Sequence, residues 1–417
     1  MKKEKTNPET NINLKATLSI FGKGIVFLLL SSQTYANEKL YEGIGERLSQ
    51  MKEVAAYKFR KGIPIQSIER EERVISLAIQ AGLSQRITKE SLRKIFQTQI
   101  EAAKEIQFCW IEKFAKMTSP PESPDLTQVI RPKLETLGKN IVKQIPYHVA
   151  NNESFFSHLD VECLPDKSKY RILAALQEVK FYNNSLEQIT ESGILRVGTT
   201  GDYAPFSFES LSSGKLEGID IDLAKSLAEK LKVNIVFVKT SWPDLMDDLA
   251  RLKYDIAMSG VSITKARSKK AYFSNPYHVG GKVPISLCSK ADRFSSLEQI
   301  DREGITLIVN PGGTNEKYLD ENIKYATKML HDDNKTIFSR IIDGKADLMI
   351  TDKIEVSLQT KTNPKLCGTL EEPLNYQEKG FMISKDDAFQ TVLNDWLKEL
   401  VVSGELREKF TVHLGRN

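Results

Sequence analysis

The stretch Asp347-Leu-Met-Ile-Thr-Asp-Lys-Ile-Glu355 decides how the second half of this chain folds. Its apolar residues predict a buried strand, and the polar residues after them predict a turn into a helix. The carboxylates of Asp352 and Glu355 follow that strand. Because open α/β domains bind ligands at the carboxyl ends of their strands, we expect Asp352 at the edge of a cleft. Glu355 should lie one helical turn further on, within reach of the same cleft.

The segments around this stretch alternate between strand-like and helix-like patterns. In the first series they are residues 194–197, 222–231, 233–238, 242–252 and 255–258. This alternation predicts a parallel sheet, and a second series from Val283 predicts a second lobe. We expect the carboxylate within Gly218-Ile-Asp-Ile-Asp222 to cap a helix.

The first half of the chain shows helical periods from about residue 38 to 117. Gly62-Ile-Pro64 should end one helix, Ser67 should cap the next, and Thr88 should precede a third. Polar side chains interrupt the apolar stripes of these helices, namely Arg47, Lys58, Arg70, Glu71, Gln99 and Gln107. For any one of them, a snorkelling side chain or a misjudged helix face is the simpler explanation. Taken together they predict an anionic ligand, because buried cations are costly unless anions pair with them.

Composition excludes several classes of function. The chain has 417 residues, enough for two or three domains, and 59 cations against 55 anions give a net charge of +4. No basic run with interleaved aromatics suggests nucleic-acid binding. The four cysteines lack CxxC spacing and the five histidines form no HExxH, so we expect no metal site.

The N-terminal residues resemble an export signal. Lys15 and Lys23 precede the apolar run Ile25-Val-Phe-Leu-Leu-Leu30, and Thr34 and Ala36 have the spacing of a cleavage site. The apolar run is too short to span a bilayer. We expect residues 1–36 to be a signal peptide, the mature protein to be periplasmic, and no membrane association to remain after cleavage.

The helical half resembles the all-helical chorismate mutases of the secreted subclass. The resemblance rests on Glu46 to Lys58, Gly62-Ile-Pro-Ile65, Arg70-Glu71 and the helix from Gln99 to Gln107. It implies that Arg47 and Arg70 bind the substrate carboxylates, that Lys58 and Gln107 contact the ether oxygen, and that Glu71 takes the ring hydroxyl. Two departures are Ala103, where the family often has a hydroxyl residue, and Asn140, where our alignment places a further family arginine. Lys139, beside it, could supply that charge without the bidentate geometry of arginine.

The second half resembles the periplasmic amino-acid-binding proteins and, more narrowly, the cyclohexadienyl dehydratases. The narrower match rests on Gly198 to Tyr203, Gly280-Gly-Lys282, Val309 to Glu316, Asp333 to Phe338 and Thr351 to Glu355. It implies that Glu355 is the acid that protonates the departing ring hydroxyl. An exposed glutamate is the ordinary case on a helix, so its place in the matched stretch is what favours catalysis.

The resemblance also implies the remaining site residues. Acid groups of the substrate would be held by Arg267, Lys282 and Asn310, with help from Ser262 and Thr314. Tyr203 and Trp242 would flank the ring, and Asp352 would take a ligand ammonium. Hinge crossings should fall near Gly280–Val283 and Phe381–Ser384, and the final helices should return to the first lobe.

Cys288 and Cys367 both follow strand-like runs of the second lobe, so we expect them to form a disulfide. We expect Cys109 and Cys163 to be free or packed.

Together the two halves predict an all-α bundle at residues 37–184 followed by a two-lobed α/β domain at residues 185–417. The first family makes prephenate and the second consumes prephenate or arogenate. We therefore expect a bifunctional enzyme of phenylalanine biosynthesis that needs no cofactor, and the helical subclass implies a homodimer. The alternative is an exported amino-acid-binding protein with a non-catalytic helical domain.

Overall fold

The computed structural model describes residues 37–415 except 120, 150 and 211. The chain divides into two compact units between Phe181 and Tyr182, whereas the sequence analysis placed the boundary after residue 184. The expected signal peptide, residues 1–36, lies outside the described residues. Within those residues, no helix combines the length and the apolar character that crossing a membrane requires.

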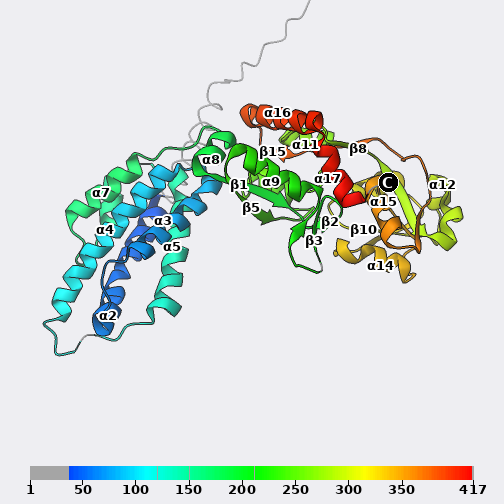
Figure 1. The fold of residues 1–417 in the computed structure, drawn as a ribbon. Helices are drawn as coiled ribbons and strands as arrows, with labels where there is room; N and C mark the ends of the chain where they lie inside the picture. The colour runs from blue at the N-terminus through cyan, green and yellow to red at the C-terminus, as the bar shows by residue number, and fades with distance from the viewer. Residues whose placement is uncertain (1–36, 120, 150, 211, 416–417) are drawn as a thin grey trace, which may run out of the picture. The chain divides into compact units, whose positions relative to one another are not determined.

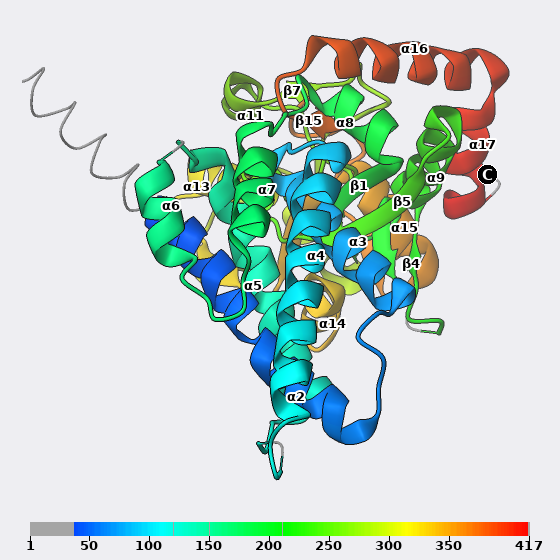
Figure 2. The same ribbon diagram turned by 90° about the vertical axis from the view of Figure 1, so that its left-hand side faces the viewer.

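The first unit is a bundle of helices (Figure 1). Residues 37–49 are helical. The elements that follow are α2 (Met51–Lys61), α3 (Ile68–Gly82), η1 (Leu83–Gln85), α4 (Lys89–Phe114), η2 (Leu126–Ile130), α5 (Arg131–Gln144), η3 (Ile145–Tyr147), α6 (Asn152–His158) and α7 (Asp166–Gln177). The long helix α4 packs against α2, α3 and α7, and Figure 2 shows it running along the bundle.

The helix boundaries follow from local chemistry and confirm the sequence analysis. Gly62 ends α2 with a left-handed φ of 63°, which glycine adopts without strain. The Ser67 hydroxyl accepts from the amide of Arg70 at the start of α3, and the Thr88 hydroxyl accepts from the amide of Ser91 at the start of α4.

A disulfide joins α4 to the segment between α6 and α7. Cys109 and Cys163 are bonded, with 5.9 Å between their Cα atoms. The expectation that these cysteines would be free or packed was wrong. Cys163 lies in a loop whose return to the third helix is a tertiary contact that helical periodicity does not show.

The second unit begins with a lobe built on a mixed sheet (Figure 1). Its elements are α8 (Ser185–Ser192), β1 (Ile194–Thr199), β2 (Asp202–Tyr203), β3 (Ser207–Glu209), β4 (Leu216–Glu217), α9 (Ile219–Leu231), β5 (Asn234–Lys239), α10 (Leu245–Ala250), β6 (Ile256–Ala257), α11 (Lys265–Lys270), β7 (Tyr272–Phe273) and β8 (His278–Gly280). The sheet order is β5-β1-β6-β15-β7, with β5 and β6 parallel to β1 as the alternating pattern predicted.

The chain then builds a second lobe. Its elements are β9 (Lys282–Leu287), η4 (Cys288–Phe294), α12 (Leu297–Ile300), β10 (Thr306–Val309), α13 (Thr314–Asn322), β11 (Thr327–Leu330), η5 (Asn334–Thr336), α14 (Ile337–Ile342), β12 (Leu348–Asp352), α15 (Lys353–Thr362) and β13 (Leu366–Gly368). The sheet order is β11-β10-β12-β9-β13. All five residues of β12 are buried, because the sheet is covered on both faces. Cys288 is bonded to Cys367, the pair that the sequence analysis expected, with 4.8 Å between their Cα atoms.

The return to the first lobe runs through β14 (Gln377–Lys379), β15 (Met382–Ile383), α16 (Asp387–Ser403) and α17 (Glu405–Leu414). β14 pairs with β8 in a two-stranded ladder that links the lobes, and β15 already belongs to the sheet of the first lobe. The second crossing therefore precedes the predicted Phe381–Ser384. Apolar residues of α16 pack on those of β1, which confirms that the final helices return to the first lobe.

The expected carboxylate cap of α9 was wrong. Gly218 occupies the N-cap position, and the Asp222 carboxylate instead contacts Lys225 at 3.3 Å and His413 at 2.9 Å. The helix α9 begins at Ile219, three residues before the start that the sequence analysis expected, so Asp222 lies within its first turn and not at its cap.

Candidate active sites

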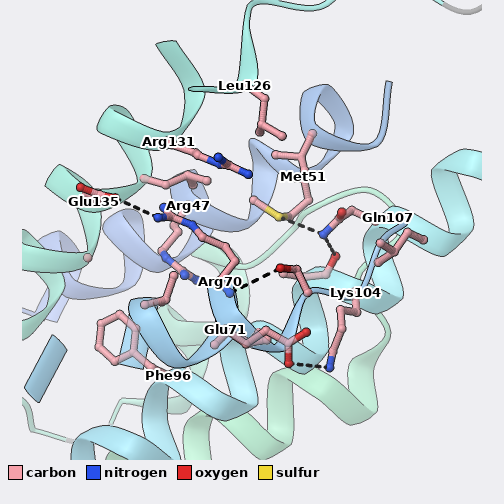
Figure 3. A pocket seen from close by; sticks show the side chains of 18 of the residues that line it. Arg47, Met51, Arg70, Glu71, Phe96, Lys104, Gln107, Leu126, Arg131 and Glu135 are labelled. Carbon is pink, nitrogen blue, oxygen red and sulfur yellow. Dashed lines mark hydrogen bonds and ion pairs between the residues drawn. The ribbon is translucent and has the colours of Figure 1, made fainter. Parts of the chain in front are cut away.

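The helical unit contains a cavity of about 380 Å³, which falls in the usual range for small-molecule sites. Its walls come from residue 47, α2, α3, α4 and α5, and Figure 3 shows the side chains that point into it. Every residue that the sequence analysis assigned to this site lines the cavity: Arg47, Lys58, Arg70, Glu71 and Gln107. Residues that lie far apart in the sequence thus meet at one place.

Arg47 is held at the base of the pocket. Its side chain is buried, donates to Gln99 Oε1 at 3.3 Å and lies over the ring of Phe96 at 5.6 Å from the centroid. Burial, and then the nearby charge of Arg70, lower the pKa of Arg47 to about 10. The guanidinium remains charged at neutral pH, and its environment favours an anion beside it.

Lys58 is positioned by the turn that ends α2. Its Nζ donates to the carbonyl oxygen of Ile65 at 2.6 Å, a contact that the left-handed Gly62 makes possible by reversing the chain. Burial, followed by the charge of Arg131, lowers the pKa of Lys58. The negative charge of an anionic ligand would oppose this lowering of the pKa.

Two ion pairs on the pocket wall were not predicted. Arg70 Nη1 contacts Glu135 Oε1 at 3.0 Å, and Lys104 Nζ contacts Glu71 Oε2 at 3.1 Å (Figure 3). Glu135 comes from α5 and Lys104 from α4. Glu135 thus places a negative charge beside Arg70, and Lys104 places a positive charge beside Glu71. The sequence analysis assigned both Arg70 and Glu71 to the substrate.

The charge balance of the pocket points to an anion. Six cationic side chains and two anionic side chains line it, which are Arg47, Lys58, Arg70, Lys104, Arg131, Lys139, Glu71 and Glu135. Three buried polar atoms, Arg47 Nε, Glu71 Oε1 and Gln107 Oε1, have no hydrogen-bond partner among the described residues. Buried polar groups in native proteins are usually paired, so these atoms mark where a polar ligand would bind.

The third arginine of this pocket is Arg131, which the sequence analysis missed. It is the first residue of α5 and lines the cavity, as does Lys139, whereas Asn140 does not. Asn140, where we expected the further family arginine, lies nine residues after Arg131 on the same helix. Ala103 also lines the cavity, where its carbonyl oxygen accepts from Gln107 Nε2 at 3.0 Å.

The second unit has a smaller cavity between its lobes. The cavity measures about 30 Å³, far below the roughly 300–1,000 Å³ of ordinary small-molecule sites. Most of the predicted residues line it: Tyr203, Trp242, Ser262, Arg267, Asn310, Thr314 and Asp352. Lys282 and Glu355 are buried and do not line it. The lobes are closed in this structure, so a ring-bearing substrate must enter through an opened form.

Asp352 stands at the centre of a buried charge cluster at the end of β12. Its Oδ1 contacts Lys282 Nζ at 2.6 Å, and its Oδ2 contacts Lys379 Nζ at 2.7 Å and accepts from the hydroxyl of Tyr203. Burial acts to raise the pKa of Asp352, but the two ammonium groups hold it well below its usual range. The carboxylate is therefore ionised and already paired with two cations.

Glu355 lies in the first turn of α15 and is only 3% exposed. Its Oε2 accepts from the hydroxyl of Thr351, one turn earlier. Burial raises the pKa of Glu355 to about 8, the Thr351 hydrogen bond opposes that rise, and the charge of Asp352 adds to it. A carboxyl group in this environment keeps its proton at neutral pH, which is what a general acid requires.

The aromatic and cationic walls of the cleft lie where the sequence analysis expected them. The rings of Tyr203 and Trp242 meet edge to face with centroids 5.8 Å apart, and Trp242 Nε1 donates to Asp202 Oδ1 at 3.2 Å. Arg267 Nη1 donates to the carbonyl oxygen of Ser262 at 2.9 Å. Burial lowers the pKa of Arg267. The first lobe thus presents two aromatic rings, set edge to face, beside a cation.

Two further cleft residues escaped the sequence analysis. Lys379 is buried, although it stands in the polar stretch Gln377-Glu-Lys-Gly380. Asn334 donates to the carbonyl oxygen of Asp202 at 3.0 Å across the cleft, and its Oδ1 has no partner among the described residues. Asn334 belongs to the matched stretch Asp333 to Phe338, so its position was a signal that we did not use.

Comparison with known proteins agrees with this geometry. Residues 195–415 match the profile of the bacterial extracellular solute-binding proteins, family 3. The chain belongs to this family. Residues 35–108 match chorismate mutase type II, so the family-3 solute-binding fold here follows a chorismate mutase region.

Relatives of the family-3 domain include both an enzyme and binding proteins. The cyclohexadienyl dehydratase of Pseudomonas aeruginosa is 49% identical over 238 residues, which cover 57% of this chain and 88% of that protein. The L-cystine-binding protein TcyJ of Escherichia coli is 29% identical over 255 residues, covering 60% of this chain and 94% of TcyJ. The family-3 domain is therefore more similar in sequence to that enzyme than to that binding protein.

Solved structures give the same fold. The ancestral amino acid-binding protein AncCDT-1, described as a precursor of cyclohexadienyl dehydratase, is 33% identical with a TM-score of 0.52, covering 55% of this chain and 99% of that one. A P235GK mutant of ArgBP from T. maritima is 27% identical with a TM-score of 0.51, covering 56% of this chain and all of that one. The family-3 domain thus has the fold of amino-acid-binding proteins.

Proposed function

We infer that this chain is a bifunctional enzyme of phenylalanine biosynthesis. The first unit rearranges chorismate to prephenate. The second unit converts prephenate, or arogenate, to phenylpyruvate, or phenylalanine, by decarboxylative dehydration. The presence in one chain of a chorismate mutase type II region and a close relative of a cyclohexadienyl dehydratase supports this function.

For the rearrangement, the helical pocket need only bind and orient its substrate. The reaction is concerted and needs no nucleophile or proton transfer, so catalysis rests on a compact bound conformer and on donors at the breaking C–O bond. We assign Arg47 and Arg70 to the carboxylates, Lys58 and Gln107 to the ether oxygen, and Glu71 to the ring hydroxyl. Arg131 adds a further cation, and the unpaired atoms of Arg47, Glu71 and Gln107 support these assignments.

For the dehydration, the decisive observation is the burial of the Glu355 carboxyl, which raises its pKa to about 8 and favours the protonated form at neutral pH. As the bond between the ring and its carboxylate breaks, carbon dioxide leaves and the electron pair enters the ring. The C–O bond to the ring hydroxyl then breaks, and the proton of Glu355 converts the departing group to water. Hydroxide alone is a poor leaving group, so an acid with a pKa near neutral is suited to this step.

The walls of the cleft support the binding roles that we propose. We assign Arg267, Lys282, Asn310, Ser262 and Thr314 to the acid groups of the substrate. Tyr203 and Trp242 flank its ring. These residues are brought together by the closed lobes, although Lys282 lies just behind the cavity surface.

Asp352 receives a different role from the one that the resemblance implied. Both of its oxygens already face ammonium groups of the protein, so it offers little to a ligand ammonium. We assign it the role of a fixed counter-ion that orients Lys282 and raises the pKa of Glu355.

The alternative function is an exported amino-acid-binding protein with an inactive helical unit. The observation that favours it is the fold shared with amino-acid-binding relatives such as TcyJ and AncCDT-1. That function gives no reason to bury an acid behind the cleft, because binding without turnover does not require a proton donor.

Three finer features belong to the proposal. We propose export to the periplasm, because the solute-binding family is extracellular and both disulfides suit an oxidising compartment. We propose a homodimer, by resemblance to the secreted mutases. The substrates are small molecules, and we expect no cofactor, no nucleic acid and no membrane association after signal cleavage.

Product identification from chorismate tests the whole proposal. Purified full-length protein is incubated with chorismate, and the products are separated and quantified over time. Prephenate should appear first and phenylpyruvate should follow. Unchanged chorismate would reject the mutase activity. Lasting accumulation of prephenate, together with no turnover of arogenate supplied in a separate reaction, would reject the dehydratase activity and favour the binding-protein alternative.

A further inference from the structure

Lys379 is a buried lysine that neither the expected mechanism nor the family resemblance uses. It is 3% exposed and lies at the end of β14, in the ladder that links the two lobes. Its backbone also forms a bridge with Ser262 of the first lobe. A buried lysine is rare unless its charge is paired, so its partners indicate what it does.

The ammonium of Lys379 contacts both lobes. Its Nζ donates to the carbonyl oxygen of Gly260 in the first lobe at 2.8 Å and to Asp352 Oδ2 in the second at 2.7 Å. It also lies 5.0 Å from the ring centroids of Tyr203 and Phe206, both of the first lobe. One charged group therefore ties the aromatic wall, the first lobe and the counter-ion beside Glu355 together.

We propose that Lys379 is a further positioning residue of the dehydratase site, which fixes Asp352 across the closed lobes and sets the charge beside Glu355. This inference rests on the proposed function. Lys282 and Asp352 alone would form a neutral pair, and Lys379 makes the cluster cationic. The charge of Lys379 therefore opposes the influence of the Asp352 carboxylate, which makes Glu355 hold its proton more tightly. With this balance, Glu355 can release its proton during turnover.

The groups that surround this cluster come from several elements. Glu355 interacts electrostatically with the charged or titratable side chains of Asp352, Lys282, Lys379 and Tyr203. Lys379 interacts in turn with His278 of β8 and Asp220 of α9. In this set, Asp352 raises the pKa of Glu355, and both lysines lower it. Removal of the Lys379 charge should thus raise the pKa of Glu355 further.

The test compares Lys379→Met and Lys379→Arg with the wild-type protein. The rate of prephenate turnover is measured from pH 6 to 10 as kcat and kcat/KM. For Lys379→Met we expect the alkaline limb to move upward by about one pH unit, as loss of a nearby opposite charge predicts. We also expect kcat to fall by about ten- to hundredfold because Asp352 loses its fixed position. Lys379→Arg keeps the charge, so its limb should stay at the wild-type pH even if its kcat falls.

Controls separate this inference from the proposed function and from simple damage. Lys335 forms the exposed ion pair with Glu209 at 2.6 Å, also between the lobes, so Lys335→Met should leave the limb in place. Chorismate consumption by the helical unit reports equal amounts of intact chain. If the wild type does not turn over prephenate or arogenate, the proposed function fails. If the wild type is active and Lys379→Met lowers the rate equally at every pH, or leaves it unchanged, only the Lys379 inference fails.

A folding defect in Lys379→Met does not end the test. Lys379→Gln, a second neutral variant, is then measured together with thermal unfolding of each protein. A limb shift in Lys379→Gln but not in Lys379→Arg supports the inference. If both neutral variants are unfolded while Lys379→Arg is folded and active, the charge serves stability, and the inference is overturned.

Discussion

Replacement of Glu355 by glutamine removes the proposed acid and keeps its shape. The amide can still accept from the Thr351 hydroxyl, so the first turn of α15 should keep its geometry. A positioned general acid contributes about 10²- to 10⁴-fold to a rate. Because hydroxide is a poor leaving group, we expect kcat for prephenate to fall by about 10³-fold or more, while prephenate still binds. Turnover within tenfold of the wild type would refute the acid role.

The pH dependence of activity and stability gives a second measurement on the same variant. The pKa of Glu355 is raised to about 8, so wild-type activity should fall as the pH rises through 8. Below pH 4.5 both folded and unfolded chains hold the proton, and between 4.5 and 8 only the folded chain holds it. Stability is therefore lost as the pH rises through this window, by about 5 kcal/mol at most.

The glutamine variant does not titrate there, so its unfolding free energy should exceed that of the wild type most clearly at pH 9. Urea unfolding at pH 5 and pH 9 measures the difference. Chorismate consumption in the same samples serves as the internal control, because the helical unit is unchanged. If the unfolding free energy of the wild type and of the variant changed equally between pH 5 and pH 9, burial would not raise the pKa of Glu355 as assigned.

Three further predictions concern the helical unit. Lys58→Ala should lower kcat/KM for chorismate by about 10²-fold or more, since the donor to the ether oxygen is lost; a rate near that of the wild type rejects the role. Glu135→Gln should lower KM for chorismate several-fold, because Arg70 no longer exchanges a protein carboxylate for a substrate carboxylate. An unchanged or higher KM would show that the pair with Arg70 does not compete with substrate. Loss of the Cys109–Cys163 bond in a double serine variant should cost about 4 kcal/mol of unfolding free energy, the loop-closure value for a separation of 54 residues, and urea unfolding of the chain should show it.

Local chemistry made much of this fold predictable from the sequence. Gly62 ends α2 because it adopts a left-handed φ, and the hydroxyls of Ser67 and Thr88 start α3 and α4 because they accept from backbone amides of the first turn. All three effects involve only nearby residues, so they can be predicted from the sequence. The buried strand before Asp352 was likewise visible as an apolar run, and the resemblance then directed attention to Glu355.

The residues that escaped prediction depend on contacts between distant segments. Lys379 stands in a polar stretch and becomes buried only because two lobes close over it. Arg131 enters the pocket because of where α5 begins, which no periodicity fixes to the residue. Cys109 and Cys163 meet because a loop folds back onto a helix. In each case the sequence near the residue resembles an ordinary exposed segment.

The tight closure of the second cleft has a consequence for anyone who seeks to inhibit this enzyme. A molecule large enough to compete with prephenate has no entry to a space of about 30 Å³, so its measured affinity will be the intrinsic affinity reduced by the fraction of molecules whose lobes stand apart. Soaking compounds into crystals of the shut form should therefore miss good inhibitors, and growing crystals with the compound already present should recover them.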